Sequence, residues 1–218
     1  MIFKEWIKVR WFWLLFTLLG LLAVGYLFIK VRHDFTFSGA KNYWYSVLFQ
    51  GYLWFKVLKF LPLVGGVLLA VAQYFPETVS KRIKLTFHLP VEENRSLLVM
   101  MLFGVLLLMA SYLFILGVML GLSVFWFPGE IIGAMVVSVT PWFLAGLAAY
   151  SLGALVILEP VWLYRILYFL VAAAFVPLFL KSSVAGGYAP ALLPLLLITL
   201  LLSIALLFSG YRFRKGEM

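Results

Sequence analysis

The stretch ETVSKRIKLTFHLPVEEN, residues 77–94, is the densest run of charge in the sequence, and it lies between two long apolar segments. The chain of 218 residues is 66% hydrophobic and 11% charged, with a mean hydropathy of +1.12. A chain this apolar cannot cover its surface with polar groups, which excludes a soluble globular domain. We therefore expect an integral membrane protein in which residues 77–94 form a connection outside the bilayer.

Six apolar segments occur on the two sides of this stretch, at residues 11–29, 53–75, 97–125, 131–158, 161–180 and 191–208. Each approaches or exceeds the roughly 20 residues that a helix needs to cross about 30 Å of hydrocarbon. Gly and Pro interrupt several of them, which membrane helices tolerate where neighbouring helices satisfy the freed backbone groups. The sequence thus predicts an all-α, polytopic membrane protein, a single transmembrane domain over 1–218 with six transmembrane helices.

Residues 1–10, MIFKEWIKVR, mix apolar and charged side chains ahead of the first apolar segment. This pattern is typical of an amphipathic helix that lies in the membrane interface. We expect an N-terminal elbow helix there, although a basic cap on the first span is an alternative.

The distribution of Lys and Arg over the connections predicts the orientation. Basic residues are enriched in cytoplasmic connections of membrane proteins. One side receives Lys4, Lys8, Arg10, Lys81, Arg82, Lys84, Arg95, Arg165, Arg212, Arg214 and Lys215, and the other receives Lys30, Arg32, Lys41, Lys56, Lys59 and Lys181. The first side is therefore expected to be cytoplasmic, with both termini and residues 77–94.

Several function classes are disfavoured by what the sequence contains. It has no cysteine, and its two histidines, His33 and His88, lie far apart, so we expect no metal site. The net charge of +9 is explained by basic residues at span ends that meet anionic lipid headgroups, so nucleic acid is not an expected partner. No set of catalytic groups shares one plausible pocket, so we expect no enzyme activity in this chain.

The connection at residues 76–95 mixes apolar side chains with Lys81, Arg82 and Lys84. Such a segment is too apolar for a flexible linker and too charged for the bilayer, so it should dock on another surface. The alternative is a loop that anchors to lipid headgroups through its basic residues.

The order of these features resembles the membrane subunit, or permease, of type-2 ABC exporters. In that family an acidic residue follows the second span, a Gly or basic residue comes several positions later, and a Leu-rich turn ends in Pro before the third span. Glu77, Lys81 and residues 85–90 match those positions. The resemblance implies that the loop forms a coupling helix seated on a separate ATPase subunit, with coupling residues Glu77, Lys81, Arg82, Lys84, Leu85, Phe87, Leu89 and Pro90.

The resemblance also implies the partners. The sequence has no GxxxxGK[ST] phosphate loop, so ATP would be bound by the partner subunit and this chain needs no cofactor of its own. Six spans are half of the usual set, which implies a second copy or a homologous permease, in contact with membrane lipids. The expected location is the inner membrane of a bacterium.

Two further segments are candidates for the transport pathway. Lys56 and Lys59 are three residues apart near the outer end of the second span and so share a helical face. They either extend to the interface or line an outward vestibule that attracts an anionic substrate, where Glu130 could pair with one of them. Residues 181–190 are expected as an outer hairpin, either re-entrant or a Gly/Pro-rich turn.

The sequence is therefore interpreted as the permease subunit of an ABC exporter. Two alternatives remain, a scaffold or assembly subunit of an envelope complex that moves no substrate, and a membrane enzyme that acts on lipid. The sequence does not identify a substrate.

Overall fold

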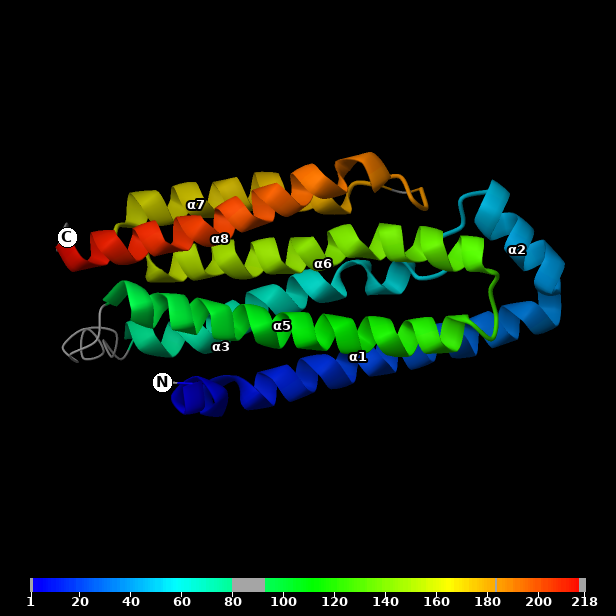
Figure 1. The fold of residues 1–218 in the computed structure, drawn as a ribbon, viewed down its shortest axis with the longest axis horizontal. Helices are drawn as coiled ribbons and strands as arrows, with labels where there is room; N and C mark the ends of the chain where they lie inside the picture. Colours follow the sequence, from blue (N-terminus) through cyan, green and yellow to red (C-terminus); the bar gives the residue numbers. More distant parts are fainter. Residues whose placement is uncertain (1, 80–92, 183, 216–218) are drawn as a thin grey trace.

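The computed structural model describes residues 2–79, 93–182 and 184–215, and for 93–94 and 206–215 it describes the backbone alone. All regular elements in this part of the chain are helical, as the sequence predicts (Figure 1). They are α1 (Ile2–Ser38), α2 (Ala40–Phe49), η1 (Lys56–Lys59), α3 (Leu61–Val79), α5 (Glu93–Ser123), α6 (Gly129–Leu158), α7 (Trp162–Phe175), η2 (Val176–Leu180), η3 (Ala189–Ala191) and α8 (Leu192–Lys215).

Five of these segments are long and apolar enough to cross a membrane, which makes the chain compatible with a polytopic membrane protein. They are Ile2–Ser38, Lys56–Val79, Arg95–Ser123, Gly129–Leu158 and Trp162–Leu180. The apolar helix at Ala189–Ala205 is shorter than these within the residues whose side chains are described. The sixth crossing therefore stays a prediction.

The long helices lie side by side along the long axis of the molecule (Figure 1). The start of α1, the end of α3, the start of α5, the α6–α7 turn and the end of α8 lie at one end of the bundle. We call this the terminal end. Helix α2 lies across the other end, which we call the α2 end.

Small residues bring α3 and α6 together at the centre of the bundle. A Cβ atom added to Gly66 would lie 2.0 Å from the carbonyl oxygen of Gly146, so the two backbones are in direct contact. The Tyr112 hydroxyl of α5 donates to the Pro62 carbonyl of α3 at 3.0 Å beside the same contact. Close approach at small residues is the usual way for membrane helices to pack, because lipid supplies no hydrophobic force between them.

The residues expected to form a separate elbow helix are the first turns of α1. The helix is continuous over 37 residues, and Glu5 and Val9 are buried in it. At about 1.5 Å per residue this helix is longer than the hydrocarbon layer is thick. Figure 1 shows its first turns, dark blue, nearly end-on while the rest follows the long axis, so the helix changes direction near its start.

The second apolar segment differs from the expected 53–75 at both ends. It starts with the 3-10 turn η1, and α3 continues through Pro76 to Val79. Proline removes only one backbone donor, and the Thr78 hydroxyl donates to the carbonyl of Phe75 at 2.9 Å, which satisfies one of the last carbonyls of the helix. Glu77, expected in the loop 76–95, is therefore part of a helix.

Aromatic side chains fill the α2 end instead of facing only the membrane interface. The ring of Trp54 stacks on that of Phe127 with centroids 4.6 Å apart, and Trp54 is buried. The Trp44 indole donates to the Trp126 carbonyl at 3.1 Å and ties α2 to the α5–α6 connection. These three tryptophans thus pack in or against the core of the α2 end, whereas Trp162 is exposed.

The outer connection around residues 181–190 forms turns between η2 and η3. Gly186 has a φ of 73°, a conformation that favours glycine, and its N–H donates to the Ser138 hydroxyl of α6 at 2.7 Å. The Tyr188 hydroxyl donates back to the carbonyl of Leu178. The described part of this connection is therefore fastened to α6 and to η2.

Candidate functional site

Charged side chains from α1 and α3 meet at the terminal end. Lys4 and Lys8 are four residues apart and Glu5 and Lys8 three, so α1 presents all of them to one side. The last two turns of α3 present Gln73 and Glu77 in the same way, four residues apart.

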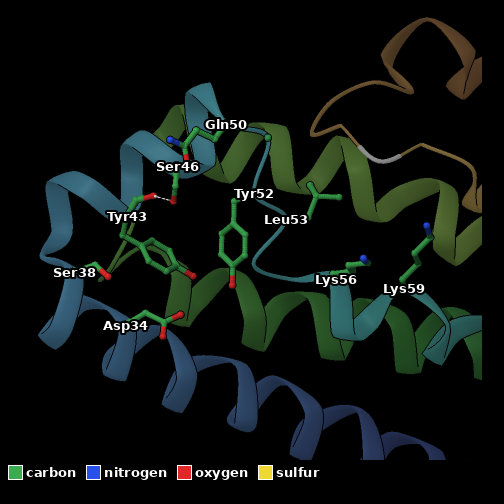
Figure 2. A pocket seen from close by; sticks show the side chains of 10 residues that line it. Asp34, Ser38, Tyr43, Ser46, Gln50, Tyr52, Leu53, Lys56 and Lys59 are labelled. Atoms are coloured by element: carbon green, nitrogen blue, oxygen red, sulfur yellow. Dashed lines mark hydrogen bonds between the residues drawn. The ribbon is translucent and has the colours of Figure 1, made fainter.

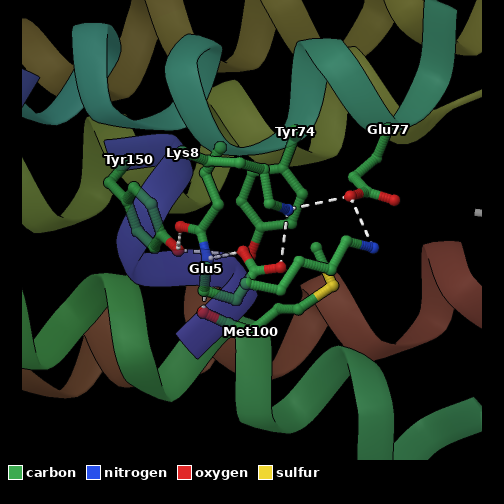
Figure 3. A network of polar contacts seen from close by, with 8 residues as sticks. Glu5, Lys8, Tyr74, Glu77, Met100 and Tyr150 are labelled. Carbon is green, nitrogen blue, oxygen red and sulfur yellow. Dashed lines mark hydrogen bonds and ion pairs between the residues drawn. The ribbon is translucent and has the colours of Figure 1, made fainter. Parts of the chain in front are cut away.

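Glu77 is the centre of the ion pairs. Its Oε1 lies 2.9 Å from the Nζ of Lys4 and 2.8 Å from the Nζ of Lys8, and its side chain is 1% exposed. Lys8 also contacts the Oε1 of Glu5 at 2.5 Å (Figure 3). Two carboxylates and two ammonium groups sum to zero, so each buried charge has the opposite charge beside it, which is the condition for keeping charges inside a protein.

Hydrogen bonds extend this group across the bundle. Gln73 Nε2 donates to Glu5 Oε2 at 3.1 Å and to the Met100 carbonyl of α5 at 2.7 Å. The Tyr150 hydroxyl of α6 donates to Gln73 Oε1 at 2.7 Å and lies 3.2 Å from the hydroxyl of Tyr74. The network therefore joins α1, α3, α5 and α6, as Figure 3 shows. We call Lys4, Glu5, Lys8, Gln73, Tyr74, Glu77 and Tyr150 the clasp.

A glycine of α5 makes room for the clasp. A Cβ atom added to Gly104 would lie 2.0 Å from the Tyr150 hydroxyl and 2.5 Å from Gln73 Oε1. The polar groups occupy the space that any other residue at 104 would need.

The clasp is suited to holding or transmitting force rather than to chemistry. Its carboxylates are occupied by lysines, and no group of three metal-binding side chains occurs within the described residues. Removing one partner of a buried ion pair costs about 3–5 kcal/mol, because a charge is left without its counter-charge. The clasp therefore ties α1 and α3 to each other at the terminal end.

A second polar site is a cleft of about 660 Å³ at the α2 end (Figure 2). Its lining combines hydroxyl, amide and charged groups of Asp34, Ser38, Tyr43, Ser46, Gln50, Tyr52, Lys56 and Lys59 with Gly51 and Leu53. Burial raises the pKa of the Tyr43 phenol, and the nearby Tyr52 and Asp34 raise it further. Figure 2 shows Asp34 and the two lysines at opposite ends of the cleft.

An apolar groove of about 580 Å³ shares Lys59 with the lining of the cleft. Its walls are the start of α3, the end of α7 and η2, and Lys181 also lines it.

The structure places the predicted site residues in three groups. Glu77 is in the clasp, and Lys56 and Lys59 line the cleft. Glu130 is exposed in the first turn of α6 and makes no ion pair with either lysine in the described part of the chain. Outside the described residues lie Lys81, Arg82, Lys84, Leu85, Phe87, Leu89 and Pro90.

Sequence reasoning missed most of the clasp. The sequence pattern predicts Glu5 and Lys8 in an interfacial helix over residues 1–10, and it predicts Gln73 and Tyr150 inside apolar segments. The spacing of Gln73 and Glu77 at four residues was the available signal, since it places two polar groups on one face of a helix that is otherwise apolar.

No family model, no curated protein and no solved structure matches the chain.

Proposed function

We propose that the chain is the permease subunit of an ABC exporter in the inner membrane of a bacterium. In this proposal six spans cross the membrane, the terminal end faces the cytoplasm, and residues 80–92 dock on a separate ATPase subunit. The observation that carries the proposal is the burial of Glu77 between Lys4 and Lys8. Glu77 lies in the last turn of α3, directly ahead of residues 80–92 in the chain. Glu77 is also the acidic position that the type-2 exporter resemblance identifies.

The clasp gives the proposal a physical route for coupling. A displacement of the end of α3 would carry α1 with it through two ion pairs, and α5 and α6 through Gln73. Four helices would then respond to one docking event. Because all of its pairs are made within the chain, the clasp would move as a rigid unit, and its side chains would keep their partners instead of exchanging them for water.

The pathway would lie between two copies of the chain. Helix α7 has no buried residue, so its apolar surface is available to lipid or to a second copy. In the proposal, Lys56 and Lys59 of the cleft give the outward side a positive potential that attracts anionic cargo. Glu130 would contribute through its charge alone.

The test is recovery of the complex from native membranes, followed by reconstitution with the copurified ATPase. Glu77→Lys places three positive charges together in the clasp, so we expect ATP hydrolysis to continue while transport falls at least tenfold. Lys81→Glu is expected to weaken the response of ATP hydrolysis to cargo. Lys30→Glu, a charge reversal at an exposed residue outside the clasp, the cleft and the groove, is the control and is expected to leave coupling intact. Wild-type transport by the Glu77 variant would remove the case for coupling.

A static scaffold is the second candidate, and the complete internal pairing of the clasp favours it equally. A scaffold predicts that the chain copurifies with envelope proteins and without an ATPase. Glu77→Lys would then lower the amount of assembled complex and would change no nucleotide hydrolysis.

A further inference from the structure

The cleft and the groove at the α2 end differ in chemistry and meet at one residue. The cleft has hydroxyl, amide and charged lining groups, whereas the groove is lined by apolar side chains with Lys59 and Lys181 as its charged members. A polar hollow beside an apolar one, with Lys59 in both linings, matches a ligand with a polar head and a hydrocarbon tail.

The charges at the junction are not balanced. Within the described chain Lys56, Lys59 and Lys181 make no ion pair, and the ammonium of Lys59 lies 5.9 Å from the ring centre of Phe60. Asp34 lies at the far end of the cleft, 3.5 Å from the Nδ1 of His33 (Figure 2). An anion beside Lys59 would meet a positive charge with no ion-pair partner, with Lys56 in the lining of the cleft and Lys181 in the lining of the groove.

We propose that the cleft and the groove together bind one anionic phospholipid of the surrounding leaflet. Its phosphate lies at the junction beside Lys59, the rest of its headgroup enters the cleft, and one acyl chain follows the groove along α7. Volumes of about 660 and 580 Å³ both lie in the range of ligand pockets. A free anion would leave the groove unused, and a neutral lipid would leave the lysines uncompensated. The proposal goes beyond the proposed function and does not depend on it, because lipid binding is measured on the purified chain without any ATPase.

The charge requirement is tested by native mass spectrometry of the full chain in detergent, with equal additions of dioleoyl phosphatidylglycerol and dioleoyl phosphatidylcholine. We expect the wild-type protein to retain the anionic lipid preferentially. Each lysine near an anionic headgroup contributes a factor of about five, so Lys59→Gln with Lys181→Gln should reduce the preference by up to about 25-fold. Lys41→Gln, exposed in α2 and absent from both linings, is the matched control and should retain the wild-type preference.

The groove is tested with a neighbouring pair of variants. Ala173 lines the groove and Ala174 does not, and both are exposed on α7, so tryptophan is tolerated at either position without disturbing the core. We expect Ala173→Trp to lower retention of both lipids several-fold and Ala174→Trp to leave it unchanged. An unaltered preference in the double lysine variant, or an equal loss with Lys41→Gln, would overturn the proposal. So would an Ala173→Trp protein that binds lipid normally but loses self-association, because the groove would then be covered by a second copy.

Discussion

Replacing Lys8 by methionine removes the one side chain of the clasp that contacts both carboxylates. The 13%-exposed ammonium of Lys8 lies 2.5 Å from Glu5 and 2.8 Å from Glu77. Methionine keeps most of the length and the apolar stem, so the change isolates the charge. Glu77 keeps Lys4 as a partner, but Glu5 is left with no ion pair and a single hydrogen bond from Gln73.

The expected cost follows from that difference. Breaking a buried ion pair costs about 3–5 kcal/mol, and the remaining hydrogen bond to Glu5 places the expected loss near the lower limit, about 3 kcal/mol. Adding Glu5→Gln to Lys8→Met removes the buried charge that was left behind. The double variant should therefore be more stable than the Lys8 variant, with at least about 1.5 kcal/mol of coupling between the two positions.

The assay is reversible unfolding in mixed detergent micelles, followed by the fluorescence of the eight tryptophans. The single variants Lys8→Met and Glu5→Gln and the double variant close a thermodynamic cycle. Lys30→Met, an exposed lysine at the other end of α1, controls for the loss of a positive charge. If the two single losses simply add in the double variant, or if Lys8→Met costs no more than Lys30→Met, the clasp is not held by this ion pair and the reasoning fails.

Three further changes test other parts of the bundle. Tyr150→Phe removes hydroxyl hydrogen bonds but no charge, so the same assay should show the free energy of unfolding reduced by about 0.6 kcal/mol and at most by about 1.7 kcal/mol. A loss as large as that of Lys8→Met would contradict the expectation that the ion pair matters more than these hydrogen bonds. Gly66→Ala forces a Cβ to 2.0 Å from the Gly146 carbonyl, so folding yield should collapse, whereas Gly25→Ala, with no atom within 4 Å, should stabilise the protein by up to about 1 kcal/mol. Ser138→Ala removes the acceptor that fastens the outer connection, and limited proteolysis after residue 184 should accelerate without a change in unfolding midpoint.

The apolar segments could be predicted because their signal is local. A run of about 20 apolar residues predicts a membrane-spanning helix without any knowledge of what the helix packs against. The ends of the segments were less predictable, since they depend on tertiary contacts. Pro76 reads as a terminator, but the helix continues to Val79 because Glu77 has lysines to bind and Thr78 caps a carbonyl.

The candidate sites could be predicted only in part, for a similar reason. The resemblance identified Glu77, but its partner Lys8 is 69 residues earlier in the chain. The sequence pattern of α1 does not indicate which of its faces packs against α3. The amphipathic pattern of residues 1–10 is equally suited to a lipid interface and to a polar cluster inside the bundle. The spacing of Lys56 and Lys59 predicted that they lie together, but the cleft beside them also requires Tyr43 and Ser46 of α2 and Tyr52, for which the sequence predicts no element.

The clasp and the hollows at the α2 end differ in their balance of positive and negative charge, and this difference bears on the role of each. In the clasp, two carboxylates and two ammonium groups neutralise one another, so this group carries no net charge. Such a group resists deformation, because every partial opening exposes an unpaired charge. At the α2 end, the lining of the cleft and groove carries Lys56, Lys59 and Lys181 against Asp34, an excess of positive charge beside an apolar wall. Helices α1 and α3 both connect the two ends: α1 carries Glu5 and Lys8 of the clasp and Asp34 of the cleft, and α3 begins two residues after Lys59 and ends at the clasp. In the proposed function, a displacement at the clasp would therefore reach the cleft through both helices.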